Sequence, residues 1–205
     1  MEIVRNRLSP HFLFNLLSGI SAETSHSVQV KDNLKTLMRL LRSSVDNCEQ
    51  TAIPLKEELE LVEGYINLQK WRIAEPFAAI YEIKEGTNMN HPVPAMIIQI
   101  PVENAIKHGL MPLPGEKLLK IKIENYFGGL MIKIEDNGSG YSLSGNRITG
   151  EGTGLKTLFQ TILLLNSANS SKIEFSIKDL KDATDPHEGT IVEIRIPNDY
   201  SYNFN

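Results

Sequence analysis

The 205-residue sequence predicts an α+β fold, with a helical region over residues 1–75 followed by an α/β domain over residues 76–205. Apolar residues recur at helical spacing up to about residue 75, and most segments after it alternate at strand spacing. Hydrophobic residues make up 41% of the chain and charged residues 22%, which is typical of a globular protein. The two regions are therefore expected to bury their apolar side chains in different ways.

Composition limits the classes of function. A formal net charge of −4 does not favour direct nucleic-acid binding, which usually needs a basic surface. Cys48 is the single cysteine, so no internal disulfide or thiolate zinc site can form, and a reducing compartment is expected. No apolar run reaches the roughly 18 residues of a membrane span, so we expect this fragment to be soluble. The first eight residues read as helix without a cap, which indicates either a cut from a longer protein or a frayed first turn.

The helical region carries two amphipathic stripes, one from Leu13 to Ile20 and one from Leu34 to Val45. A further helix is predicted after Pro54, and its apolar face consists of Leu55, Leu59, Val62 and Ile66. Such wide apolar faces need a partner, and the simplest one is a second copy of the chain in a four-helix bundle, which is a homodimer. The alternative is that these helices pack on the downstream domain of the same chain.

The α/β domain begins with a predicted strand over 77–84 and a helix from near Pro94 to His108. Strands over 119–124 and 130–134 then form a hairpin around a Gly128-Gly129 turn. A helix over 154–165 and strands over 172–177 and 190–196 complete the domain. We expect one antiparallel-rich sheet with its helices on one face.

The first polar motif lies on the predicted helix that ends at His108, and it reads QIPVENAIKHG over residues 99–109. Glu103 and Lys107 are four residues apart, as are Asn104 and His108, so these side chains share adjacent helix faces. An amide oxygen can bind Mg²⁺, and the cationic groups can meet phosphate charge. The motif is therefore suited to a magnesium-bound polyphosphate, although a polar helix end with i,i+4 pairs would look the same.

Two glycine-containing motifs follow, EDNGSG at residues 135–140 and GEGTGL at residues 150–155. The first stands where a strand ends, so its glycines would let the backbone approach a ligand while an acidic group accepts from an exocyclic amine. The second precedes a helix and would present N–H groups to an anion. It lacks P-loop spacing and does not open a parallel βαβ unit. Taken singly, the motifs also fit an ordinary turn and a connector.

In this order, the three motifs resemble the N, G1 and G2 boxes of the GHKL ATPase superfamily. The resemblance implies a GHKL-type α/β sandwich that binds ATP and Mg²⁺ under a lid at Tyr141 to Glu151. It further implies that Asn104 holds Mg²⁺, that Asp136 accepts from the adenine amine, and that Lys107 and His108 face phosphate. The remaining nucleotide-binding residues that it implies are Gly138, Gly140, Gly152, Gly154 and, from the GT before the last strand, Thr190.

One further motif, RLSPHFLFN at residues 7–15, selects a branch of that superfamily. PHFLFN resembles the phosphoacceptor box of the LytS/YehU-like sensor histidine kinases, and the resemblance continues through the chain between the boxes. It implies that the N-terminal helical hairpin dimerises and that ATP phosphorylates His11. The commonest histidine kinases place an acidic residue directly after this histidine, where this chain has Phe12, so the proton acceptor is left open. Glu103 is expected to be the base or orienting group, and Asn15 a possible orienter of His11.

The resemblance also implies partners and a location. The phosphoryl group would pass from His11 to an aspartate in the receiver domain of a response regulator. The full-length protein would lie at the bacterial inner membrane through an upstream sensor region, with this part on the cytoplasmic side. Two other functions stay open: a GHKL ATPase that drives a conformational clamp, and a nucleotide-binding module without phosphotransfer.

Overall fold

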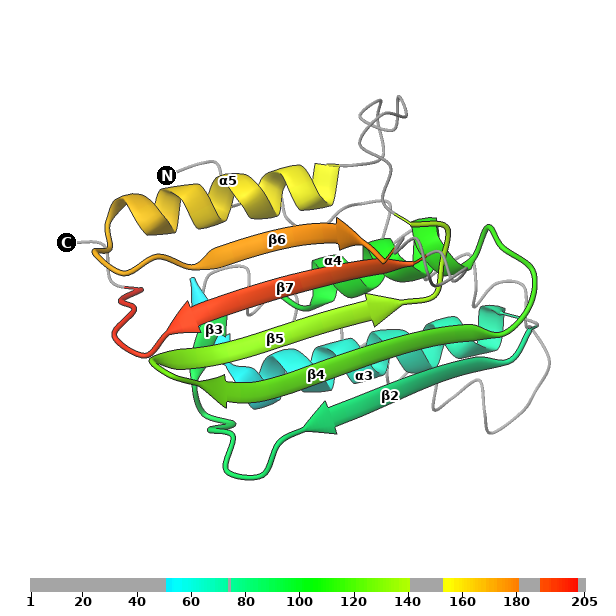
Figure 1. The fold of residues 1–205 in the computed structure, drawn as a ribbon, viewed down its shortest axis with the longest axis horizontal. Helices are drawn as coiled ribbons and strands as arrows, with labels where there is room; N and C mark the ends of the chain where they lie inside the picture. The colour runs from blue at the N-terminus through cyan, green and yellow to red at the C-terminus, as the bar shows by residue number, and fades with distance from the viewer. Residues whose placement is uncertain (1–50, 74, 141–152, 181–188, 203–205) are drawn as a thin grey trace, which may run out of the picture.

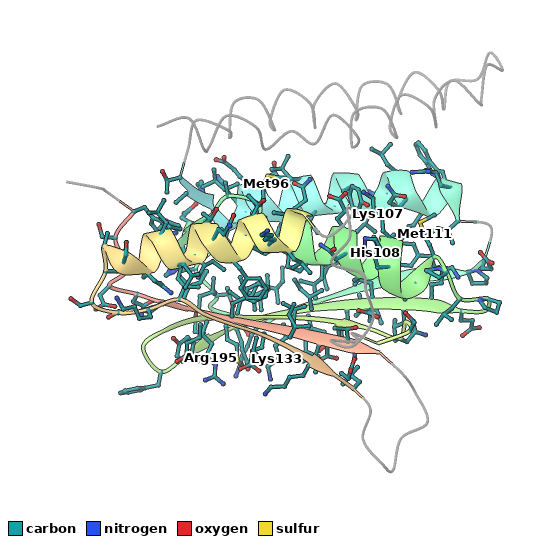
Figure 2. All side chains as sticks on the ribbon, turned by 90° about the horizontal axis from the view of Figure 1, so that it is seen from above. Met96, Lys107, His108, Met111, Lys133 and Arg195 are labelled. Carbon is teal, nitrogen blue, oxygen red and sulfur yellow. The ribbon has the colours of Figure 1, made fainter. Side chains whose placement is uncertain are left out.

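The computed structural model describes residues 51–73, 75–140, 153–180 and 189–202. A five-stranded sheet in the order β2-β4-β5-β7-β6 carries the helices on one face (Figures 1 and 2). β2 pairs with β4 in parallel, and the other neighbours are antiparallel. The predicted antiparallel-rich sheet is therefore confirmed. Its strands are β2 (Phe77–Ile83), β4 (Lys117–Tyr126), β5 (Gly129–Asp136), β6 (Glu174–Asp179) and β7 (Thr190–Pro197).

The helical layer contains α3 (Leu55–Arg72), α4 (Gln99–Asn104) and α5 (Thr153–Ser167), and α4 continues directly into the π-helical segment η1 (Ala105–Leu110). None of the helices in the described part of the chain is long and apolar enough to cross a membrane. A two-stranded sheet of β1 (Ala52–Pro54) and β3 (Pro92–Pro94) precedes α3 and α4. This antiparallel pair, which the sequence analysis did not predict, places the starts of those two helices side by side.

Side-chain alternation in β4 and β5 separates the two faces of the sheet. Leu119, Ile121 and Ile123 are buried toward the helices, and the lysines between them are partly exposed. The outer face carries ion pairs such as Lys133 with Glu193 at 3.3 Å, and Figure 2 shows Lys133 and Arg195 on the side away from the helices. Solvent-accessible pairs on one sheet face contribute little stability, so burial of the inner face dominates.

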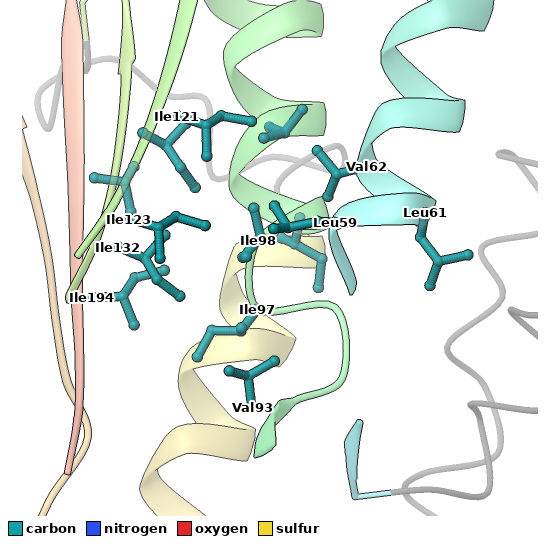
Figure 3. Close-up of a cluster of buried hydrophobic side chains, with 14 of the residues drawn as sticks. Leu59, Leu61, Val62, Val93, Ile97, Ile98, Ile121, Ile123, Ile132 and Ile194 are labelled. Carbon is teal, nitrogen blue, oxygen red and sulfur yellow. The ribbon is translucent and has the colours of Figure 1, made fainter. Parts of the chain in front are cut away.

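One hydrophobic core joins α3, α4, α5 and the sheet. Leu59 and Val62 of α3 lie close to Ile98, which stands between them and the sheet residues Ile123 and Ile132 (Figure 3). The described end of the helical region therefore packs on the downstream domain. Residues 1–50 lie outside the described part of the chain, so the division at residue 75 and the homodimer remain predictions.

Some predicted boundaries differ from the structure. The hairpin turn consists of Phe127 and Gly128, and Gly129 already belongs to β5. The helix expected from Pro94 begins at Gln99, because β3 and a turn occupy the preceding residues. We also expected His91 to be a surface residue, but it is only 8% exposed, and burial lowers its pKa. These residues lie where long-range packing, rather than local periodicity, decides the conformation.

Candidate functional site

The first predicted motif lies across the junction of α4 and η1. Pro101 falls in the first turn of α4, where a missing backbone N–H removes no intrahelical hydrogen bond. After Asn104 the helix widens, and the Met111 N–H donates to the Ile106 carbonyl oxygen at 2.9 Å, five residues back. Short π-helical segments of this kind are frequent at functional sites. Here the segment carries Lys107 and His108, which Figure 2 shows close together on the helical layer.

Asn104 has its amide oriented by its own helix. The side-chain Nδ2 donates to the Ile100 carbonyl oxygen at 2.7 Å. This bond uses the donor end of the amide and leaves the oxygen, the atom that binds hard cations, to face other groups. Mg²⁺ in phosphate-transfer sites commonly takes only one or two protein ligands together with substrate phosphates. Asn104 therefore fits the role of a single protein ligand.

Glu103 and Lys107 form an ion pair along the helix, in which the Lys107 ammonium contacts Glu103 Oε1. Both side chains are partly buried, so the contact is less screened than a surface pair. The Glu103 charge also acts on Tyr65 of α3. Burial, and to a smaller extent the Glu103 charge, raises the pKa of Tyr65 well above its usual value. One oxygen of Glu103 is thus committed to Lys107, and a role as base would need the other oxygen or loss of the pair.

Asp136 ends β5 and is only 5% exposed. Its Oδ1 accepts the Gly138 N–H at 2.8 Å, and Thr190, its antiparallel partner on β7, donates to it from both backbone and side chain. The pKa of this carboxyl is raised to about 6, mainly by burial and to a smaller extent by the Asp179 charge, while the hydrogen bonds from Gly138 and Thr190 act to lower it. The predicted residues Asp136, Gly138 and Thr190 therefore come together at one sheet end.

The N and G1 motifs meet through backbone contact between two glycines. A Cβ on Gly138 would lie 2.4 Å from the Gly109 carbonyl carbon, and one on Gly109 would lie 2.8 Å from Asp136 Oδ1. The Ser139 N–H donates to the Gly109 carbonyl oxygen at 3.2 Å. Gly109 was part of the quoted motif but not of the predicted site, and the absent side chain is what allows the end of η1 to approach Asp136.

Asn137 is a second residue that the sequence analysis missed. Its Oδ1 accepts the Leu118 N–H at 2.7 Å, and its Nδ2 donates to the Glu116 carbonyl oxygen at 3.0 Å. The side-chain amide thus pairs with the β4 backbone as a strand residue would, and it fixes the turn in which Asp136 and Gly138 lie. An Asn in a DNG sequence is so common in turns that this role left no distinct signal.

The other predicted glycines lie around this centre. Gly140 has a φ of +77°, a conformation that favours glycine, and a Cβ there would lie 2.9 Å from Asp179 Oδ1. Gly154 lies in the first turn of α5, where a Cβ would contact Ile100 of α4 at 3.5 Å, so the second glycine motif reaches the first motif. His11, Asn15, Gly152 and the predicted lid at 141–151 lie outside the described residues.

The Gly109–Gly138 contact predicts a large difference between two alanine substitutions. Gly138→Ala is expected to lower the free energy of unfolding by about 2 kcal/mol or more, because a Cβ would overlap the Gly109 backbone. Gly154→Ala is the matched control and should change it by less than about 1 kcal/mol, since its contact with Ile100 is ordinary. Urea denaturation of both variants measures the difference. Equal stabilities would contradict the close approach of the two motifs.

Comparison with known proteins shows which proteins this chain resembles. Residues 1–77 match the histidine kinase family, and the match ends at the first residue of β2. The sensor histidine kinase YpdA of Escherichia coli is 28% identical over 172 residues, covering 80% of this chain and 30% of YpdA. The sensor protein LytS of Staphylococcus saprophyticus is 33% identical over 141 residues, covering 68% of this chain and 24% of LytS. The chain thus spans less than a third of either relative.

Solved structures show the same fold at low sequence identity. The histidine kinase domain of a blue-light activated histidine kinase from Erythrobacter litoralis has a TM-score of 0.51 at 17% identity, and the match covers 91% of this chain and 82% of that one. The mycobacterial sensor histidine kinase MprB also has a TM-score of 0.51, at 13% identity, covering 71% of this chain and 95% of that one. The predicted sandwich fold is therefore confirmed, and so is the predicted resemblance to sensor histidine kinases.

Proposed function

We propose, from the premise that this chain is a relative of the LytS-type sensor histidine kinases, that it is the catalytic core of a two-component sensor kinase. In this proposal ATP phosphorylates His11, and the phosphoryl group then passes to an aspartate of a response regulator. The observation that supports it best is the cluster of Asp136, Gly138 and Thr190, which lies in contact with the end of the helix that carries Asn104. This cluster stands in a chain whose first 77 residues match the histidine kinase family.

Asp136 would select the adenine base. Its pKa of about 6 leaves the carboxyl mostly ionised at pH 7, so it can accept a hydrogen bond from the exocyclic amine. The Gly138 N–H holds one oxygen in place, and burial excludes competing water. A nucleobase with a carbonyl in place of this amine would set its oxygen against the Asp136 carboxylate, and two opposed acceptors are unfavourable in a buried site. The proposed site therefore prefers adenine over guanine nucleotides.

The phosphate end of the site would be formed by α4, η1 and the start of α5. Asn104 would bind Mg²⁺, which neutralises phosphate charge when bound. Lys107 and His108 would face the phosphate groups, with Lys107 exchanging part of its contact with Glu103 for the nucleotide. Gly140, Gly152 and Gly154 would let the backbone approach the nucleotide closely.

His11 would act as the nucleophile. An imidazole with a pKa of about 6.5 is roughly three-quarters neutral at pH 7, so a ring nitrogen can attack without a strong base. That nitrogen forms a bond to the γ-phosphorus while the bond to the bridging oxygen breaks, and ADP leaves. Positioning and charge neutralisation then carry most of the catalysis. Glu103 would orient the imidazole or accept its proton, with Asn15 as a second orienting group.

The proposed partners follow from the same resemblance to sensor histidine kinases. Two copies of the chain would pair through residues 1–50 of the predicted helical region, because the apolar face of α3 is buried in the core of its own chain. A receiver domain would dock to accept the phosphoryl group. In the full-length protein, an upstream sensor region would attach this core to the cytoplasmic side of the bacterial inner membrane.

Incubation of the 205-residue chain with ATP labelled at the γ-phosphate tests the proposal. A kinase would give label on the protein that is stable to base and lost in acid, as expected for phosphohistidine. Free labelled phosphate without labelled protein would instead indicate an ATPase. Nucleotide binding with neither product would indicate a binding module, and either of these two results would overturn the kinase proposal.

A further inference from the structure

Glu58 of α3 is fully buried, although it is a charged residue on a helix rich in exposed acidic residues. Its Oε1 accepts the N–H groups of Ile98 and Gln99 at 3.0 and 3.1 Å, and its Oε2 accepts the Met96 N–H at 3.0 Å. Burial raises the pKa of this carboxyl, while the bonds from Gln99, Met96 and Ile98 act to lower it. These three hydrogen bonds all go to one backbone segment, the start of α4.

These contacts complete the beginning of α4, which has no cap of its own. Ile98 stands at the N-cap position and has no side chain that could accept a hydrogen bond. The first backbone donors of a helix have no intrahelical partners. Glu58 accepts the N–H groups of Ile98 and Gln99, and the Ile100 N–H donates to the Met96 carbonyl oxygen. Pro101 has no backbone N–H to satisfy. The helix start is therefore closed by a side chain from a different helix.

Met96 provides an independent sign that this segment is held by α3. Its φ of +67° is the only positive value of a non-glycine residue in the described part of the chain. Such a conformation costs free energy and persists only where surrounding contacts impose it. Here it directs the Met96 N–H to Glu58 Oε2. The pairing of β1 with β3, and the bond from the Leu55 N–H to the His91 carbonyl oxygen, hold the same two chain segments together just upstream.

We propose that Glu58 is a positioning residue, which fixes the start of α4 to α3 and thereby sets where Asn104 presents its amide oxygen. α4 runs only from Gln99 to Asn104 before it continues into η1, so a shift of its start moves Asn104 with it. Asp136 has no hydrogen bond to Glu58 or to the start of α4 among the described contacts; it is held by Gly138 and by its β7 partner Thr190. The inference rests on the proposed function, since it assigns Glu58 to the metal end of the nucleotide site and not to the adenine end.

The test compares ADP binding with Mg²⁺ and with EDTA, by calorimetry, in the 205-residue chain. Glu58→Gln keeps the size of the side chain but turns one acceptor into a donor that opposes an N–H group. We expect it to reduce the gain in ADP affinity that Mg²⁺ provides by about tenfold, with metal-free binding within about twofold of the original. Glu60→Gln, the same change at an exposed residue of α3, is the matched control and should change neither value. An unchanged Mg²⁺ gain in a folded Glu58→Gln variant would overturn the inference.

Hydrogen exchange separates this inference from the proposed function and needs no nucleotide. In the unmodified chain, the Met96, Ile98 and Gln99 amides should exchange as slowly as the buried core of α3. In Glu58→Gln the same amides should exchange at least about tenfold faster. If these amides exchange at loop-like rates in the unmodified chain, the proposed anchoring of α4 by Glu58 is wrong, even if the variant fails to fold. If slow exchange were found but no nucleotide bound, the anchoring of α4 by Glu58 would stand and the proposed function would fail.

Discussion

Replacement of His11 by glutamine is expected to remove all protein-bound phosphate, while ATP binding stays within about twofold of the original. Glutamine is close to histidine in size but has no nucleophilic ring nitrogen, so phosphoryl transfer loses its acceptor. The nucleotide contacts proposed for Asp136, Thr190 and Asn104 do not involve this residue. Labelling with γ-phosphate, together with calorimetric titration of the same samples, measures both quantities.

His26→Gln is the matched control for this experiment, because it makes the same change in the same helical region at a histidine outside the PHFLFN motif. The label should be retained in this variant. Label that persists on His11→Gln would show that another residue accepts the phosphoryl group. Such a result would remove the assignment of His11 and leave the nucleotide site intact.

Asp136→Asn is expected to weaken ATP and ADP binding by about 100-fold or more without lowering the stability of the fold. The carboxylate has two acceptor oxygens, and Gly138 and Thr190 already donate to it. An asparagine has one acceptor and one donor, so a donor would face the adenine amine or one of these protein donors. Calorimetric titration with ADP measures the loss. Binding within about threefold of the original would contradict the adenine assignment.

The stability of the same variant is a separate expected result. A carboxyl whose pKa rises from 3.8 to about 6 on folding costs roughly 3 kcal/mol at pH 7, because the charged form is disfavoured by burial. A neutral amide removes that cost but loses a hydrogen bond worth about 1 kcal/mol. The free energy of unfolding at pH 7 should therefore stay the same or rise by about 1–2 kcal/mol. A clear fall in urea denaturation would show that the charge stabilises the fold.

The pH dependence follows from the same carboxyl. Between pH 3.8 and about 6 the folded state holds more protons at Asp136 than the unfolded state, so this group makes stability fall as pH rises through that window. ADP affinity should change in the opposite way and weaken as pH falls below about 6, because protonation turns one acceptor oxygen of the carboxyl into a donor. Nucleotide phosphates titrate in a similar range, so the dependence is read as the difference between the original chain and Asp136→Asn. Equal pH profiles would contradict the assigned pKa.

The sequence by itself determined the periodic elements and the order of the motifs. Alternation of apolar and charged residues gave β4, β5 and β7 to within a few residues, because the sheet has one buried and one exposed face. The pattern after Pro54 gave α3, and the glycines before Leu155 marked the start of α5. The resemblance to the GHKL motifs pointed to Asp136 and Thr190, and the structure brings these two residues into contact.

Only the tertiary structure decided which distant segments hold one another. In the sequence Glu58 looks like one more acidic residue on an amphipathic helix, yet its partners lie 38 to 41 residues away at the start of α4. The β1–β3 pair, the approach of Gly109 to Gly138 and the amide of Asn137 depend in the same way on contacts between segments. Periodicity reports how a segment divides its own side chains between core and solvent. It carries no information about which backbone donor a buried carboxylate will meet, because that choice is made when the layers pack together.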